Sequence, residues 1–284
     1  MQSSFQRSII MVFLICFPLF YGSTVDASWE IGTKAGFDSN VDRAIDDGRD
    51  DVYLSAYTSF NRNPSGESRL DWSFAATIEG TTYKTLGDLG YAEIVIAPGI
   101  VYYPNRSWNV TVSPFFQAKG VRDSDQSAIA FGGKVSMRQQ LWGDIYLGQY
   151  FIYKDSSAKA DVYSFSENAV GVYAGVNWTS SFFSEIGYEY SHGDSFRSID
   201  EYSAEPAIIS TSFHGRGRHR YMYSSAFGEF LIREPVDRNA IGFNAGFDLG
   251  KSLSSLLNYT FTKLGGDLGS SESHSGFVGL GYRF

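Results

Sequence analysis

Acidic and basic side chains recur at every second position in several segments of this 284-residue sequence. In segment 29–38, Glu30, Lys34 and Asp38 alternate with the apolar Trp29 and Phe37. A period of two places charged and apolar side chains on opposite faces of a β-strand. The charged faces carry both acidic and basic side chains. Such faces suit two roles: guiding ions that pass along them, or pairing with one another. The inward positions assigned in this way are Glu30, Lys34, Asp38, Asp71, Glu79, Glu93, Lys119, Lys134, Arg138, Glu185, Glu189, Asp248 and Arg283.

Many short strands must carry these side chains. The same alternation, bounded by turn-forming residues, predicts an all-β chain. The clearest strand is 69–79, where Leu70, Trp72 and Ile78 face one way and Asp71 and Glu79 the other. The predicted strands are 29–38, 52–61, 69–79, 91–103, 108–120, 127–140, 145–154, 164–177, 182–191, 239–249, 256–264 and 275–284.

The last strand points to a known class of proteins. Its ending, Val278-Gly-Leu-Gly-Tyr-Arg-Phe284, alternates strictly and finishes on an aromatic residue. This ending resembles the C-terminal signal of Gram-negative outer-membrane β-barrels, which the barrel-insertion machinery reads. Gly36-Phe-Asp-Ser-Asn-Val41 is also similar to the first strand of poorly characterised porin-like barrels. The resemblance implies a bacterial outer-membrane location, with membrane lipid and lipopolysaccharide around the barrel and the insertion machinery as an assembly partner.

The composition of the chain agrees with an exported protein that is built of β-strands. Arg7, the apolar run 9–21 and the small residues before Ser28 predict a secretory signal peptide over 1–27, leaving 28–284 as the barrel domain. The only cysteine, Cys16, lies in that signal. Aromatic residues make up 17% of the chain, which suits strands with aromatic belts. The net charge of −8 has the wrong sign for nucleic acid, which we exclude as a partner.

The connections alternate in length. Turns near 62–68, 104–107, 141–144, 177–181 and 250–254 are short, whereas connections near 42–51, 83–90, 121–126, 155–163 and 265–274 are longer and more polar. Short periplasmic turns and longer external loops are typical of outer-membrane barrels. We therefore predict a single antiparallel transmembrane barrel of 12 strands. Pro98 and Pro114 lie inside predicted strands, and we expect a bulge at each.

Segment 193–238 fits no single strand. Either it is one large external loop, folding into the lumen or extending as a hairpin, or it hides two further strands at 206–213 and 221–232, which would give 14. It contains His214-Gly-Arg-Gly-Arg-His-Arg220, a basic cluster in an acidic chain. Arg216, Arg218 and Arg220 are candidate contacts for a lipopolysaccharide phosphate or an anionic solute, or else an exposed loop that pairs with nearby carboxylates.

Barrel enzymes of the outer membrane place Ser/His or Asp/His groups at the external rim. Ser212 with His214, and Ser191 with His192 and Asp194, are the nearest approaches to such groups. Neither matches the motifs of those enzymes, and the histidines show no metal-ligand spacing. We expect no enzymatic activity, no cofactor and no metal, and the sequence implies no particular oligomeric state.

The predicted function is therefore passive. A hydrated lumen lined by both signs of charge favours a porin-like channel for small hydrophilic solutes or ions. The alternative is a non-conducting structural or partner-binding barrel of an envelope or export complex, in which the lumen charges pair and close the interior. A lipid hydrolase at the rim is the least favoured reading.

Overall fold

The computed structural model describes residues 27–45, 48–199 and 221–284. Three 3₁₀ helices, η2 (Gly87–Leu89), η3 (Ser124–Gln126) and η4 (Asp161–Tyr163), lie in connections between strands. No helix among these residues is long and apolar enough to cross a membrane. The strands are β1 (Ala27–Asp38), β2 (Asp51–Arg62), β3 (Leu70–Tyr83), β4 (Tyr91–Asn105), β5 (Trp108–Val121), β6 (Ala128–Trp142), β7 (Ile145–Ala158), β8 (Phe165–Thr179), β9 (Phe182–Ile199), β10 (Tyr221–Ser224), β11 (Glu229–Asp248), β12 (Leu253–Gly266) and β13 (Gly269–Arg283).

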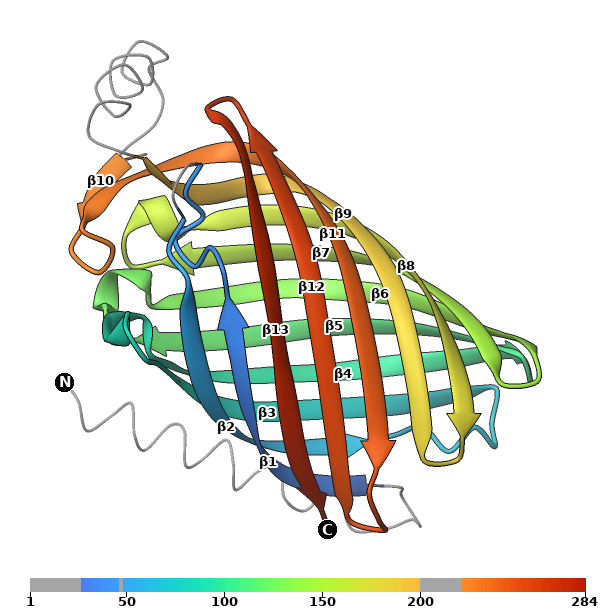
Figure 1. Ribbon diagram of the computed structural model, residues 1–284. Coiled ribbons are helices and arrows are strands. Elements are labelled where there is room, and N and C mark those ends of the chain that lie inside the picture. The colour runs from blue at the N-terminus through green and yellow to red at the C-terminus, as the bar shows by residue number, and fades with distance from the viewer. Residues whose placement is uncertain (1–26, 46–47, 200–220) are drawn as a thin grey trace, which may run out of the picture.

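Twelve of these strands close into one antiparallel barrel (Figure 1). Neighbours in the chain pair with each other, β1 pairs with β13, and β9 pairs with β11. The short β10 pairs with β11 alone and lies outside the ring. Closure leaves no unpaired sheet edge, which is the condition for strands to cross a lipid bilayer. The predicted 12-strand barrel is confirmed.

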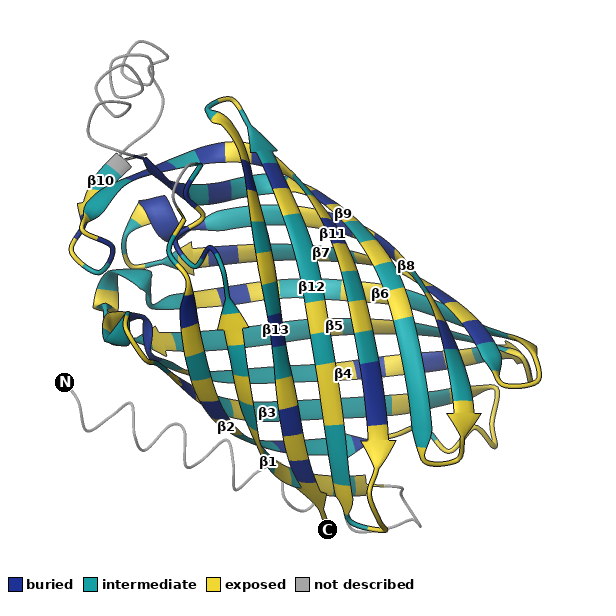
Figure 2. Cartoon of the chain, viewed as in Figure 1, coloured by how far each residue is buried: buried dark blue, intermediate teal, exposed yellow. Residues whose placement is uncertain are grey.

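Exposure alternates along the strands, as Figure 2 shows. In β1, Trp29, Ile31 and Phe37 are exposed, whereas Glu30 and Lys34 are half-buried. Large apolar side chains are likewise exposed on the outer face of the other strands, for example Ile100, Val172 and Leu280. An apolar exterior that alternates with a polar interior is the pattern of a transmembrane barrel.

The two prolines are accommodated without the bulges we expected. The register of β4 and β5 is the same on both sides of them, with Ile96 opposite Phe116 and Ile100 opposite Val112, which puts Pro98 opposite Pro114. The irregularity of this pair lies instead between Tyr102 and Asn105, beside the turn. Each proline lacks a backbone N–H, so each removes a possible hydrogen bond from the ladder. Because the two prolines lie opposite each other, both missing hydrogen bonds fall at one place in the sheet.

Most connections separate by length into two ends, although 63–69 between β2 and β3 is as long as 84–90 between β3 and β4. Short turns such as 106–107, 143–144 and 180–181 lie at the end that also holds Ala27 and Phe284. The opposite end holds the longer β1–β2 connection and the three helical turns (Figure 1). The connection expected at 265–274 is much shorter than predicted, because β12 and β13 continue to the turn Asp267–Leu268.

The strand bounds on either side of residues 200–220 also differ from the prediction. β9 continues to Ile199 and β11 begins at Glu229, so the two strands form a long ribbon that ends with Phe230 opposite Ile199. Residues 221–224 form β10, but outside the ring, so they do not raise the strand number to 14. The proposed strand 206–213 lies outside the described residues, as do Arg216, Arg218 and Arg220.

Candidate functional site: the barrel interior and its external mouth

The inner wall carries many aromatic side chains, and several lie flat against it over glycines. The ring of Tyr150 covers Gly171, and that of Tyr146 covers Gly175, so that a Cβ atom at either glycine would overlap a ring. The hydroxyl of Tyr146 donates to Glu185 (2.7 Å) and that of Tyr150 donates to Glu189 (2.6 Å). These bonds and the glycines hold the rings against the wall, which leaves space along the barrel axis.

Part of the inner charge is paired. Lys34 on β1 contacts Glu79 on β3 (2.5 Å). Arg238 on β11 contacts Glu167 (3.0 Å) and also Glu189. Near the short turns, Arg283 contacts Glu30 (3.4 Å). These pairs join neighbouring parts of the wall, so they neutralise it locally.

A second set of inner cations lies on aromatic rings. Lys119 lies over Tyr91 (4.0 Å to the ring centroid), Lys134 over Tyr150 (4.6 Å), Arg138 over Tyr146 (3.7 Å) and Lys154 over Phe165 (5.2 Å). None of the four cations makes an ion pair within 4.0 Å among the described residues. All four come from the adjacent strands β5, β6 and β7.

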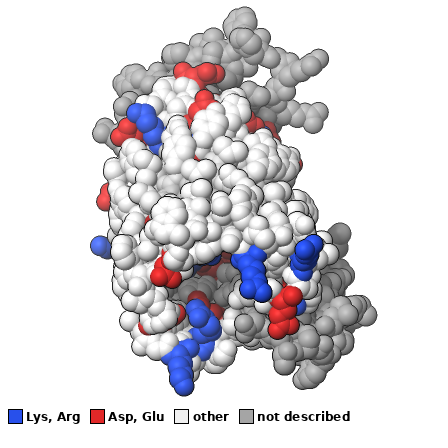
Figure 3. All heavy atoms as spheres, turned by 90° about the vertical axis from the view of Figure 1, so that its right-hand side faces the viewer, with Lys and Arg blue, Asp and Glu red and all other residues white. Residues whose placement is uncertain are grey.

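The interior contains cavities. One of about 490 Å³ is lined by Lys134, Tyr150, Arg238 and the amides of Asn244 and Asn258, among others. Another of about 270 Å³, near the short turns, is lined by residues that include Glu30, Asp248 and Arg283. Seen from the end of the short turns, the surface is hollowed, and acidic and basic side chains gather around the hollow (Figure 3).

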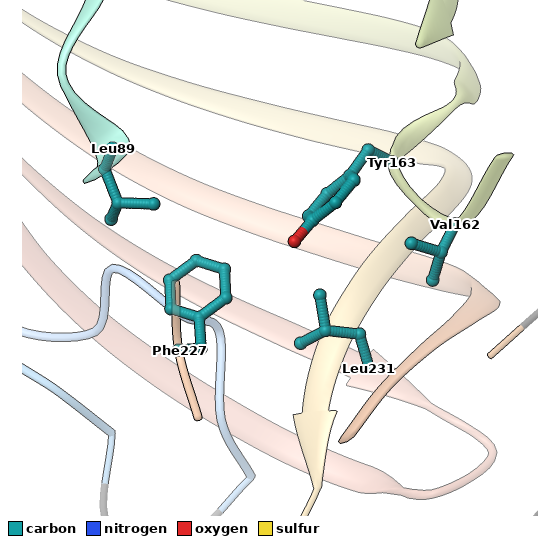
Figure 4. Close-up of a cluster of buried hydrophobic side chains, with 5 residues drawn as sticks. All are labelled: Leu89, Val162, Tyr163, Phe227 and Leu231. Atoms are coloured by element: carbon teal, nitrogen blue, oxygen red, sulfur yellow. The ribbon is translucent and has the colours of Figure 1, made fainter. Parts of the chain in front are cut away.

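The external mouth is bridged by loops that share a hydrophobic core. Leu89 of η2, Val162 and Tyr163 of η4, and Phe227 and Leu231 of the β10–β11 segment are buried against one another (Figure 4). Six strands lie between the β3–β4 connection and the β9–β11 connection in either direction around the ring, so the two connections are opposite each other. Contact between these two connections therefore requires the chain to cross the mouth. We call this cluster and its loops the external lid.

The β1–β2 connection adds polar contacts to the external lid. Arg49 contacts Glu229 beside β10 (2.8 Å). Arg43, which has a φ of 56°, donates to Ser195 and lies over the ring of Phe196.

Desolvation and the nearby guanidinium of Arg238 lower the pKa of Arg43 from its ordinary value. Burial raises the pKa of Asp42, whose side chain is wholly inaccessible. The β1–β2 connection thus places charged side chains at the lumen side of the external mouth.

A buried ion pair lies within the β9–β11 ribbon. The side chain of Arg197 is wholly inaccessible to solvent and contacts Glu234 at 3.3 Å. Arg197 also donates to the carbonyl of Gly269 (2.9 Å), which ties the ribbon to the turn between β12 and β13. A buried pair of this kind is costly to break, since each charge depends on the other for compensation.

The predicted inward residues have different surroundings. Asp71, near the start of β3, contacts Arg62 (3.3 Å) and accepts from Ser65, so it holds the β2–β3 connection. Asp38 accepts from Ser273 (2.7 Å), and Glu93 accepts from Gln117 (2.7 Å). The other predicted residues take part in the pairs, ring contacts or cavities described above, and Asp248 lies at the end of β11.

Several inner charges were missed by the prediction. Lys154 and Glu167 share the face of inward neighbours on their strands, so the alternation could have identified them. Arg238 lies one residue before the predicted start of its strand. Arg43 is in a connection, where no periodicity indicates direction.

The candidate triad of Ser191, His192 and Asp194 does not form. His192 contacts Asp237 (2.9 Å), both side chains being exposed, while Asp194 contacts Arg233 (2.6 Å). Ser191 is buried and accepts from Arg238. Consecutive residues of a strand point to opposite faces, which separates Ser191 from His192. His274 contacts Tyr259, and His214 and His219 lie outside the described residues. No group of three or more potential ligands in the described ranges could hold a metal ion.

Comparison with known proteins identifies a fold. No family model and no curated protein sequence matches the chain. An outer-membrane channel from Pseudomonas putida F1 has a TM-score of 0.57 at 8% identity, covering 93% of this chain and 97% of the channel. The KdgM porin in complex with disordered oligogalacturonate has a TM-score of 0.49 at 7% identity, over 90% of this chain and 99% of the porin. The NanC porin has 0.47 at 11%, over 89% and 98%. The chain is a closed 12-strand barrel of the outer-membrane type.

Proposed function

We propose that the protein is a passive channel of the bacterial outer membrane for small hydrophilic solutes or ions. The charged inner wall with its cavities carries this proposal. A barrel that only spans the membrane has no need of charged side chains around open interior space. Aromatic rings that lie flat on glycines keep this space from being filled by their own bulk.

The external lid defines how such a channel would work. Its loops cross the mouth in this structure, so solute passage requires them to move apart. We therefore propose low conductance at rest and higher conductance when the lid is loosened.

The same lid favours a second candidate. A barrel with a bridged mouth and paired inner charges also suits a non-conducting barrel that binds a partner in an envelope or export complex. In that case the loops would serve as a docking surface and the interior would not transmit solute.

Conductance in planar bilayers separates the two candidates. The purified protein is compared with Phe227→Asp/Leu231→Asp, which places two carboxylates in the lid core, and with Leu253→Asp as a control for a new charge at the short-turn end. Larger or more frequent openings in the lid variant support the channel. If neither protein conducts, although both migrate as folded barrels, the channel is rejected and the partner-binding barrel is favoured.

A further inference from the structure

We infer that the inner wall formed by β5, β6 and β7 is a binding track for small oxyanions such as carboxylates and phosphates. This inference rests on the proposed channel and names the solutes that it favours. The track consists of Arg138, Lys134, Lys154 and Lys119, which follow one another from the short-turn end toward the external mouth.

The cations of this track differ from the other inner cations in what they contact. Lys34, Arg238 and Arg283 each contact a carboxylate of the protein, and Lys34 also lies over the rings of Tyr57 and Phe277. The four track cations each contact an aromatic ring but form no ion pair with a carboxylate among the described residues. A ring attracts a cation through its face but does not accept the strong charge-assisted hydrogen bonds that a carboxylate accepts. The N–H groups of the track therefore stay available to an anion that enters the lumen.

The rings also fix where these charges lie. Tyr150 and Tyr146 are held by glycines beneath them and by the hydrogen bonds to Glu189 and Glu185. Long basic side chains lose conformational freedom when they bind a ligand, and a fixed platform reduces that loss. Lys134 and Arg138 are four residues apart in β6, so their side chains lie on the same face of the strand with Ser136 between them.

Carboxylates mark the edges of the track. Glu93 lies on β4 at one side, and Glu167, Glu185 and Glu189 lie on β8 and β9 at the other. Glu93 accepts from Gln117, Glu185 from Tyr146, and the remaining two contact Arg238. An anion is therefore drawn to the middle of this wall and repelled at its borders. The cavity of about 490 Å³ beside Lys134 has the size of a site for a small organic solute.

Thiol labelling tests the local charge. The strands of the barrel contain no cysteine, since Cys16 is the only one in the chain. Ser136→Cys places a thiol between Lys134 and Arg138, and Thr77→Cys places one on the inner face of β3, beside Ser59 and Val95 and outside the cavity that Lys134 lines. Each folded variant in detergent is treated with methanethiosulfonate reagents that end in a sulfonate or in a trimethylammonium group. We expect the ratio of anionic to cationic reaction rates to be about tenfold higher at position 136 than at position 77.

Two further measurements distinguish binding at the track from a general effect of the protein's charge on the reagents. Lys134→Gln/Arg138→Gln in the Ser136→Cys protein should lower the ratio to that at position 77, whereas Lys263→Gln, which removes a cation paired with Glu272, should not. Inorganic phosphate should slow the anionic reagent at position 136 with saturation. Equal ratios at the two positions, no response to Lys134→Gln/Arg138→Gln, or no saturable effect of phosphate would each overturn the track.

The readout does not depend on conduction. If the bilayer shows no current but labelling retains its preference for the anion, the proposed channel fails and the track stands as a binding site. If the protein conducts but labelling shows no preference, the track fails and the channel stands. Every variant is first checked for the heat-modifiable migration of a folded barrel.

Discussion

At the scale of single residues, the external lid contains a titratable group within its core. Tyr163 is buried, and its hydroxyl donates to Ser224 (3.0 Å). Burial is the largest cause that raises the pKa of Tyr163 to about 12. The lid thus binds this proton more tightly than the unfolded segment, whose tyrosine has a pKa of about 10.

The lid should therefore weaken in alkali. A raised pKa contributes stability that is complete below pH 10 and is lost as the pH rises through the folded value near 12. We expect protease cleavage of the external loops to accelerate between these limits, and Tyr163→Phe to remove most of that acceleration. Equal pH profiles for the two proteins would show that another group controls the opening. Tyr153→Phe, on the outer face of β7, is the control.

The buried pair of Arg197 and Glu234 makes a second prediction. Glu234→Ala leaves an uncompensated charge in the ribbon and should cost about 3–5 kcal/mol of local stability. Arg197→Met/Glu234→Leu should recover most of that loss, since apolar side chains need no compensation there. Hydrogen exchange of β9 and β11 measures both effects. A double variant no better protected than Glu234→Ala contradicts this account.

At the scale of elements, period-two alternation was sufficient to predict most strands. The outer face of each strand lies against lipid, so every second residue is apolar, and β1, β3 and β6 could be identified from their residues alone. Alternation fails where a strand leaves the bilayer. In β9 beyond Ser191 and in β11 before Asn239, no lipid imposes an apolar face, and the prediction ended there.

Much of the site depends on contacts between elements, which no local pattern contains. The set of inner charges followed from the alternation, but the division between paired cations and ring-bound cations did not. That division depends on which residues face each other across neighbouring strands, such as Lys134 and Tyr150. The external lid was also unpredicted, because Leu89, Val162 and Phe227 come from connections far apart in the sequence.

The junction between β11 and η4 should set the stability of the lid. Leu231 is fully buried there, and Leu231→Ala should destabilise the lid by about 2–5 kcal/mol through lost burial and the cavity left behind. Cleavage of the loops by protease should become faster while the melting of the barrel itself changes little. Leu257→Ala, on the outer face of β12, serves as the control for the same truncation. Unchanged cleavage would contradict this assignment.

At the scale of the whole molecule, the external lid links opposite sides of the ring. Cysteines at Leu89 and Phe227, joined by a short bifunctional thiol reagent, should hold the lid across the mouth and abolish openings in planar bilayers. Each single-cysteine protein treated with the same reagent should keep its openings. Conductance that survives complete cross-linking would place the solute path elsewhere.

The long ribbon makes the two sides of the barrel unequal in height. β9 has 18 residues and β11 has 20, whereas β3 and β4, which lie opposite them in the ring, have 14 and 15. At about 3.3 Å per residue, the ribbon has roughly 15 Å more strand than the opposite wall. For a barrel in an outer membrane, an antibody or a phage tail that approaches the cell would meet this crest first. Sequence drift under immune or phage pressure should therefore concentrate on the crest and spare the wall below it.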